Sequence, residues 1–263
     1  MPPEVIRSDH WQFQTAQESK LLTRIRAIGK PLGDLPIFIS QGVVTGADEV
    51  FLLRNLQEEK DGKILVEHRE SGRRYWIEAA LLRPIIRNRD IHGFGQPKPA
   101  TLCLVPYDPK GMLLAEDRLR LEFPAAHRYL LASKDRLVAG RRQKRGNWYA
   151  LTSVAGFRFA TLTRVIGGLI TSGGDMTILA DASVLCHSGV LVMAPNRFLI
   201  DPYYLLGVCN STVFWAFVQH QMPTMGNGRH TIRVERVREF PLAEPSAESA
   251  SCRNKGTRII SAT

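Results

Sequence analysis

The sequence predicts an α+β fold, in which a mixed, curved sheet of short strands carries packed helices and an N-terminal linker helix precedes the sheet. Short alternating or apolar runs separated by turn residues recur along the 263-residue chain, and alternation with a period of two is typical of strands. Two longer apolar segments have helical spacing and begin at Pro124 and Pro202. Proline is well accommodated in the first turn of a helix, so these segments are predicted to be helices.

The first third of the chain is predicted to contain one helix followed by strands. Residues 12–28 place apolar side chains at helical spacing, and Gly29-Lys30-Pro31 follows them as a stop signal. Ser71-Gly72 lies between two alternating segments, which is a pattern typical of a hairpin. The segments expected to form strands here are residues 37–40, 50–53, 63–67 and 73–77.

The rest of the chain is predicted to mix strands with two main helices. The segments expected to be helical are a short turn at residues 78–86 and helices at residues 124–138 and 202–220. The segments expected to be rich in strands are residues 100–105, 157–170 and 176–193. From Ala243 onward, Ser, Ala and charged residues follow without periodicity, which is typical of disorder. We therefore predict a linker helix at residues 1–30, one main domain at residues 31–242 and a disordered tail at residues 243–263.

Composition bounds the partners of the protein. A formal net charge of +10 indicates nucleic acid or an anionic surface as the partner, rather than a neutral metabolite. The four cysteines lie far apart without a C-x-x-C pair, so we expect free thiols in a reducing cytoplasm and no zinc site. The N-terminal sequence lacks the pattern of a secretory signal, and polar residues interrupt the most apolar runs. We therefore expect a cytoplasmic protein that does not enter membranes.

Half of the net charge is concentrated between Lys134 and Tyr149, because this segment contains six basic residues and only one acid, Asp135. The six basic residues are Lys134, Arg136, Arg141, Arg142, Lys144 and Arg145. A basic loop that ends in Trp148 and Tyr149 suits a polyanion, because cations displace counterions from phosphates and flat rings support bases or sugars. The sequence also allows a plain solvated loop whose two aromatic residues turn into the core.

Motifs of catalysis and cofactor binding are not evident. The sequence contains neither G-x-G-x-x-G after a strand nor G-x-x-x-x-G-K-[ST], the two common phosphate cradles. Residues 201–204, D-P-Y-Y, have one proline where the adenine methyltransferase motif has two, and we interpret them as a helix start. Asp108 and Glu116 lack the lysine of a nuclease site, and the histidines are scattered. We therefore predict no catalytic residue, no metal ligand and no cofactor site in this chain.

Four segments in a fixed order carry a family resemblance. Residues 41–51 read Q-G-V-V-T-G-A-D-E-V-F, and residues 82–91 read L-R-P-I-I-R-N-R-D-I. Residues 129–149 join a predicted helix to the basic run and the W-Y pair, and residues 203–215 begin with Y-Y-L-L-G-V-C-N-S. Together they resemble the C-terminal specificity domain of TaqI-like adenine-N6 DNA methyltransferases and their type IIG restriction-modification relatives. Asn88 stands where that family has glycine, and Asp48 where it has asparagine.

The resemblance implies that residues 31–242 form a DNA target-recognition domain, which binds double-stranded DNA at a specific sequence. It also implies a bacterial or archaeal origin and a role in restriction-modification and phage defence. In that family a separate catalytic domain binds S-adenosylmethionine and methylates a flipped-out adenine. This chain lacks such a domain, so the resemblance implies either a methyltransferase partner in trans or a fragment of a longer protein.

Twelve side chains are candidates for DNA contact. Arginine and lysine side chains in the basic loop and the second motif are expected to bind phosphates or guanine edges. These are Arg87, Arg89, Arg141, Arg142, Lys144 and Arg145. Further candidates in loops are Thr45, Asn88, Asn147, Asn227 and Arg229, and Trp148 is expected to brace a base step. The alternative for Arg89 is an internal ion pair with Asp90.

Two other function classes remain open at this point. One is a fragment or degenerate form of a DNA methyltransferase or endonuclease, which S-adenosylmethionine binding would favour. The other is an RNA-binding or protein-binding adaptor in phage defence. Comparable affinity for single-stranded RNA and for duplex DNA would favour the adaptor.

Overall fold

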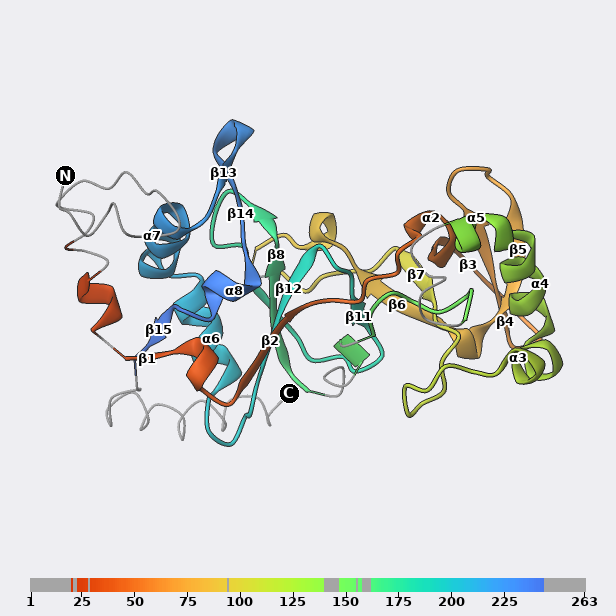
Figure 1. Cartoon of the computed structure of the whole chain (residues 1–263), viewed down its shortest axis with the longest axis horizontal. Coiled ribbons are helices and arrows are strands. Elements are labelled where there is room, and N and C mark those ends of the chain that lie inside the picture. Colours follow the sequence, from red (N-terminus) through yellow and green to blue (C-terminus); the bar gives the residue numbers. More distant parts are fainter. Residues whose placement is uncertain are drawn as a thin grey trace, which may run out of the picture. The chain divides into compact units, whose positions relative to one another are not determined.

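The computed structural model confirms an α+β architecture with several sheets (Figure 1). It describes residues 20, 23–27, 29–93, 95–139, 147–154, 156–157 and 162–243. The chain divides into two compact units. The smaller unit combines the two ends of the chain, through Leu35 and from Glu235, and the larger unit comprises Pro36–Val234.

The smaller unit brings together segments from opposite ends of the sequence. Strand β1 (Lys30–Pro31) pairs antiparallel with β15 (Pro241–Leu242), and the Leu32 N–H donates to the Phe240 carbonyl at 2.8 Å. The 3₁₀ helix η2 (Leu32–Asp34) follows β1, and α8 (Val234–Val237) precedes β15. Of the helix predicted at residues 12–28, the described part is helical at Lys20 and at residues 23–26. The remainder, and the tail from residue 244, lie outside the described residues.

A six-stranded sheet forms one part of the larger unit, in the order β11-β6-β7-β3-β4-β5. Its strands are β3 (Leu52–Lys60), β4 (Lys63–His68), β5 (Arg74–Glu78), β6 (Leu82–Ile86), β7 (Thr101–Leu104) and β11 (Leu185–Cys186). Neighbours pair antiparallel except β11 and β6, which pair parallel. The predicted β4–β5 hairpin is confirmed by this register. A register shift in β3 between Asn55 and Glu58 bends the long β3–β4 ribbon.

Three helices pack along one side of this sheet (Figure 1). They are α3 (Glu116–Glu122), α4 (Pro124–Ala132) and α5 (Lys134–Ala139). The predicted start at Pro124 is confirmed, and Glu78 explains it, because its carboxylate accepts the Ala125 and Ala126 N–H groups at 2.9 and 2.8 Å. The N–H groups of the first helical turn have no carbonyl acceptor within the helix. The Glu78 carboxylate at the end of β5 supplies one and so stabilises the start of α4.

A four-stranded antiparallel sheet forms the other main part of the larger unit, in the order β10-β8-β12-β2. Its strands are β2 (Ile37–Gln41), β8 (Arg164–Gly168), β10 (Thr177–Leu179) and β12 (Val190–Pro195). Every residue of β8, β10 and β12 is buried. Helix α6 (Pro202–Cys209) packs against β8 and β10, and α7 (Thr212–Gln221) follows it after a break at Asn210 and Ser211. A small sheet joins β9 (Ile170–Thr171), β14 (Arg229–Thr231) and β13 (Thr224–Met225).

Hydrogen bonds from Asn210 divide the helix predicted at residues 202–220 into α6 and α7. The Asn210 side chain accepts the Met176 N–H at 2.9 Å and donates to the Met176 carbonyl at 3.0 Å. Ser211 then caps α7 by accepting the Phe214 N–H at 3.3 Å. A single continuous helix was therefore the wrong prediction, because Asn210 serves the sheet and Ser211 begins a new helix.

Two further predicted boundaries were wrong. Val50 and Phe51 belong to the short helix α2 (Asp48–Phe51), and the strand begins only at Leu52. The predicted helical turn at residues 78–86 is confined to the 3₁₀ helix η3 (Ala79–Leu81), and β6 takes the following residues. In both places cross-strand pairing with β7 sets where the strand begins. No helix in the described part of the chain has the length and apolar character needed to cross a membrane.

Candidate functional site

A groove in the larger unit gathers predicted contact residues from distant parts of the sequence. It lies where the 3₁₀ helix η4 (Asn88–Asp90) meets β9 and β14. Its polar lining residues are Asn88, Arg89, Thr171, Ser172, Asp175 and Arg229. Three of the predicted contact residues, Asn88, Arg89 and Arg229, therefore share one groove.

Asn88 fixes η4 to the small sheet. Its side-chain amide donates to the Ile170 carbonyl at 3.1 Å and accepts the Ile170 N–H at 3.3 Å, as a neighbouring strand would. Gly168 makes room for this contact, because a Cβ there would lie 2.2 Å from Asn88 Oδ1. The Asn88 amide is thus committed to the backbone, and its role in the groove is to position η4.

Arg89 offers its guanidinium to solvent at the groove. Its Nε lies 3.9 Å from Asp90 Oδ1, and the Arg89 side chain is 59% exposed. The ion pair considered from the sequence is thus present but long, and exposed pairs of this kind contribute little to stability. Asp90 instead accepts the Arg87 N–H at 2.8 Å and so caps η4. The Arg89 side chain therefore remains accessible to a ligand.

Arg229 reaches the groove from a hairpin that joins β13 and β14 through the 3₁₀ turn η7 (Gly226–Gly228). Asn227 and Gly228 adopt left-handed conformations, with φ of 63° and 68°, which reverse the chain tightly. The hairpin is held at its base by His230, whose ring packs edge-on against Trp215 of α7 at 5.4 Å. Residues 223–229 are all exposed. Asn227 thus lies at an exposed tip, and Arg229 lies beside the groove.

The remaining polar wall of the groove was missed by the sequence analysis. Thr171 Oγ1 donates to the Gly173 carbonyl at 2.7 Å and accepts the Gly173 N–H at 3.1 Å, which closes a tight turn. This turn presents Ser172 and Asp175 to the groove. In the sequence, Ser172-Gly173-Gly174-Asp175 lies between the two segments expected to be rich in strands at residues 157–170 and 176–193, and turn residues alone do not identify a binding site. The pairing of β9 with β14 gives it a position beside Arg229.

Thr45 is placed away from any surface. It is 1% exposed, and its hydroxyl donates to Asp48, whose other carboxylate oxygen lies 2.9 Å from His187 Nε2. Burial acts to raise the pKa of Asp48, but hydrogen bonds with His187 and Thr45 outweigh it and hold this pKa below its ordinary value. The charges of His187 and of Arg87 act in the same direction. Thr45 therefore has a structural position, whereas the half-buried Arg87 lies near this carboxylate.

Trp148 and Tyr149 are both anchored near the start of α3. The Tyr149 hydroxyl donates to the Leu114 carbonyl at 2.6 Å, and Tyr149 is 1% exposed. Trp148 donates its indole N–H to Glu116 at 3.1 Å, and Lys134 Nζ lies 5.1 Å from its ring centre. Tyr149 thus turns into the core, as the alternative interpretation expected, and Trp148 is half-buried beside it. Asn147 is exposed, whereas Arg141, Arg142, Lys144 and Arg145 lie outside the described residues.

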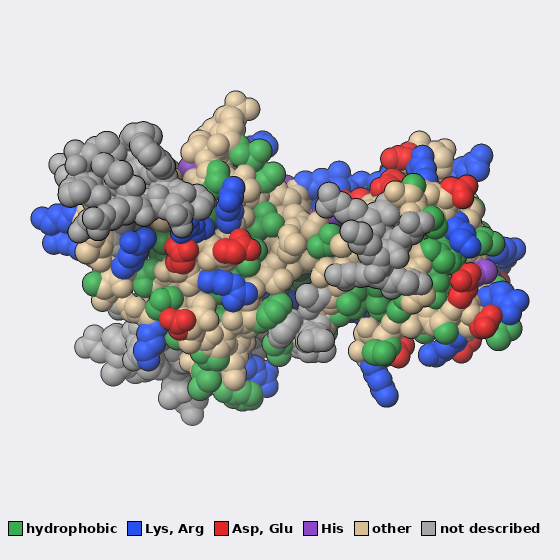
Figure 2. Space-filling view, viewed as in Figure 1, with side chains coloured by type: hydrophobic (Ala, Val, Ile, Leu, Met, Phe, Trp, Pro, Cys, Tyr) green, Lys and Arg blue, Asp and Glu red, His purple; other side chains and the backbone are tan. Residues whose placement is uncertain are grey.

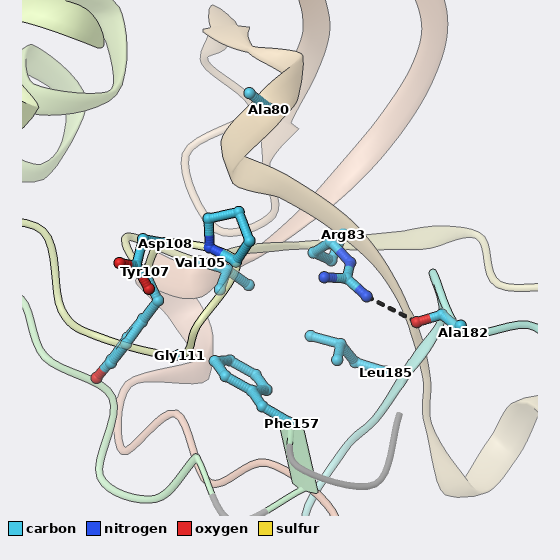
Figure 3. Close-up of a pocket in the computed structure, with 10 residues that line it drawn as sticks. Ala80, Arg83, Val105, Tyr107, Asp108, Gly111, Phe157, Ala182 and Leu185 are labelled. Atoms are coloured by element: carbon cyan, nitrogen blue, oxygen red, sulfur yellow. Dashed lines mark hydrogen bonds between the residues drawn. The ribbon is translucent and has the colours of Figure 1, made fainter. Parts of the chain in front are cut away.

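A second cavity lies between the six-stranded sheet and the segment before β11 (Figure 3). Arg83 points into it, but its guanidinium donates to the Ala182 and Ser183 carbonyls, both at 2.8 Å. Arg164 donates to the neighbouring Asp181 and Val184 carbonyls at 2.6 and 3.0 Å. Two arginines thus satisfy four successive carbonyls. They hold the turn before β11 in place, so both guanidiniums have a structural role.

Side chains that resemble a reaction centre do not have the required geometry. Asp48 and Ser188 approach the same nitrogen of His187, Nε2, at 2.9 and 3.4 Å. A nucleophile–base–acid triad needs the two partners on different ring nitrogens, so this cluster cannot relay a proton from Ser188 to Asp48. Within the described ranges, no group of three or more His, Cys, Asp or Glu side chains is placed to hold a metal ion.

Comparison with known proteins adds no assignment. No protein-family model matches the sequence, and a search of curated proteins finds no match.

Proposed function

We propose that this chain binds double-stranded DNA at a specific sequence, as the TaqI-like specificity module of an adenine-N6 DNA methyltransferase or restriction-modification system. The observation that carries the proposal is the groove between η4, β9 and β14. It brings together Arg89 and Arg229, which are both exposed, with a turn that presents Ser172 and Asp175. Cations, a hydroxyl and a carboxylate in one groove supply both donors and acceptors.

These side chain types match the edges of base pairs in the major groove. An arginine fork can bridge O6 and N7 of guanine, and a carboxylate accepts from the N4 amine of cytosine. Ser172 can pair with either donors or acceptors. Each well-placed bidentate contact contributes about 1–3 kcal/mol of discrimination against the wrong base. We assign base reading to Arg89, Arg229 and the Ser172–Asp175 turn, and we assign positioning to Asn88.

Adenine methylation itself is assigned to a partner. We propose that a methyltransferase domain or subunit in trans binds S-adenosylmethionine and carries the catalytic residues. Flipping an adenine out of the duplex costs a few kcal/mol, so the specificity module must hold the flanking duplex firmly while the partner acts. This division of labour agrees with the positive charge of the chain and with the four segments that resemble the family.

The proposal is tested by selecting bound sequences from a pool of random duplex DNA. We expect an enriched motif with wild-type protein. We also expect Arg89→Gln and Arg229→Gln each to relax the preference at one or two positions, lowering affinity for the preferred site by about 5-fold to 100-fold. Arg128→Gln is the matched control. It removes the same charge from an exposed position on α4, away from the groove.

Two results would overturn this proposal. One is binding without any enriched motif, since a specificity module must prefer a sequence. The other is an unchanged motif in both groove variants while the wild-type protein binds selectively, which would assign base reading to other residues. Competition with single-stranded RNA of the same length separates the adaptor class, because equal affinity for both polymers would favour an adaptor.

A further inference from the structure

A row of side chains crosses one face of the six-stranded sheet next to η4. Strand register places Glu67, Arg54, Thr101 and Ile85 directly opposite one another on β4, β3, β7 and β6. Residues directly opposite in antiparallel strands project from the same face, so these four side chains share a face. His68 follows Glu67 directly, so its side chain projects from the opposite face of the sheet. There it packs on Tyr129 of α4, with ring centres 6.4 Å apart. The helices therefore cover the other face.

Two further arginines belong to the face that carries this row. Arg69 follows Glu67 by two residues, and its Nη2 donates to Thr101 Oγ1 at 2.6 Å, which shows that its side chain crosses over the row. Arg87 follows Ile85 by two residues with an extended backbone, at φ −106° and ψ 163°. Alternation along an extended segment thus returns Arg87 to the same face. Arg89 of η4 lies two residues further along the chain.

Positive charge dominates this cluster. Partial burial, followed by the charges of Arg87 and Arg89, holds the pKa of Arg69 below its ordinary value, with Arg54 acting in the same direction and Asp90 opposing. The acids are already engaged, because Glu67 lies 3.4 Å from Arg54 and 3.8 Å from Arg74, and Asp90 caps η4. The charges of Arg54, Arg87 and Arg89 all act on Arg69, and this repulsion is relieved when an anion binds among them.

The orientation of Arg69 is fixed by a buried partner. Thr101 is 1% exposed, and its hydroxyl accepts from the Arg69 guanidinium. One nitrogen of the guanidinium is thereby held at the sheet, while the Arg69 residue as a whole is exposed. Figure 2 shows a group of Lys and Arg side chains near the upper middle of the view. Arg54, Arg69 and Arg89 are exposed and Arg87 is half-buried, so the cluster forms a cationic surface that a ligand can reach.

We infer that Arg54, Arg69, Arg87 and Arg89 form a phosphate clamp that holds the sugar–phosphate backbone of a DNA duplex whatever its sequence. A planar guanidinium can donate two parallel hydrogen bonds to two oxygens of one phosphate. Several neighbouring guanidiniums can therefore bind several adjacent phosphates of one strand. Arg89 lies in both the clamp and the groove, so it would link backbone binding to base reading. This inference rests on the proposed function, because it takes duplex DNA as the ligand.

The clamp is tested by the salt dependence of duplex binding. Affinity is measured for the full chain with one preferred duplex and one unrelated duplex, at several NaCl concentrations. We expect Arg69→Gln and Arg54→Gln each to weaken binding to both duplexes by the same factor, and to lower the slope of log K against log salt by about 1. Arg54 is 65% exposed, so its substitution leaves the fold intact. Arg128→Gln on α4 should leave the slope unchanged.

The outcomes separate the clamp from the proposed function. If wild-type protein binds selectively but Arg54→Gln and Arg69→Gln keep the wild-type slope, the clamp is wrong and sequence recognition stands. If the slope falls in these variants but wild-type protein has no preferred sequence, the clamp stands and sequence recognition is wrong. Equal losses in the clamp variants and in Arg128→Gln would show a general charge effect and overturn the clamp. Wild-type protein that binds no duplex would overturn both.

Discussion

Asp48 sits at a junction of three partners. Thr45 and His187 bond its two carboxylate oxygens, and the charge of Arg87 acts on it from the end of β6. This carboxylate therefore connects α2 with the segment after β11. These contacts favour the charged form of Asp48. Protonating Asp48 at low pH therefore weakens the contacts and destabilises the folded state.

The pKa of Asp48 is held below its ordinary value of 3.8 by these contacts, against the effect of burial. A carboxyl whose pKa is lower in the folded state stabilises the protein above the unfolded pKa, and this contribution is lost as pH falls through the folded pKa. We therefore expect wild-type protein to lose stability more steeply than Asp48→Asn below about pH 4. Urea unfolding between about pH 3 and about pH 6 measures this.

Asp117→Asn is the control for that experiment, because Asp117 is a surface acid with an 87% exposed side chain. It should follow the wild-type curve. An Asp48→Asn curve that runs parallel to wild type at every pH would show that Asp48 makes no pH-dependent contribution. The Thr45–Asp48–His187 contacts would then be incidental to stability.

At the scale of elements, the contact between η4 and β9 depends on one side chain and one glycine. The Asn88 side chain bonds both the N–H and the carbonyl of Ile170. Gly168 has no side chain and so leaves the space that Asn88 occupies. The two residues therefore act as a unit. Their pairing holds Arg89 beside the turn that carries Ser172 and Asp175.

A double-mutant cycle tests this unit. Asn88→Ala removes two hydrogen bonds and should cost about 1–2 kcal/mol of unfolding free energy. Gly168→Ala should cost a similar amount, because its new methyl group displaces the Asn88 side chain. The double variant should be less destabilised than the sum of the two, since the second change finds the contact already lost. Strict additivity in urea unfolding would contradict the unit.

At the scale of the whole molecule, binding and stability are linked. A ligand that binds only the folded state adds about 2.7 kcal/mol at one hundred times its dissociation constant. For a chain of 263 residues this corresponds to a rise in Tm of roughly 5–10 °C. We expect a duplex that carries the preferred sequence to raise Tm by about this amount at low salt.

Differential scanning calorimetry at low and high NaCl checks this prediction. The rise should shrink as salt increases, because phosphate contacts weaken when counterions compete. A matched duplex without the preferred sequence should raise Tm less. No rise at low salt with the preferred duplex would argue against duplex binding by the folded chain.

Much of the fold was predictable because local patterns coincide with tertiary pairing. The strands expected at residues 37–40, 63–67 and 73–77 are confirmed in β2, β4 and β5, and the Pro124 helix begins as predicted. The prediction failed where a distant partner competes for the backbone. Asn210 bonds Met176 and interrupts an otherwise apolar helical segment, and no local propensity contains that contact.

The sequence by itself determined the α+β class, through its periodicities and turn residues, and it determined the net charge of +10. It also marked Arg87, Arg89 and Arg229 as contact candidates. Only the tertiary structure decided that Arg89 and Arg229 share a groove, that Thr45 is buried, and that Arg54 and Arg69 lie on the face that carries Arg87. The physical reason is range: propensity and periodicity act over a few residues, whereas strand register brings together side chains from distant segments.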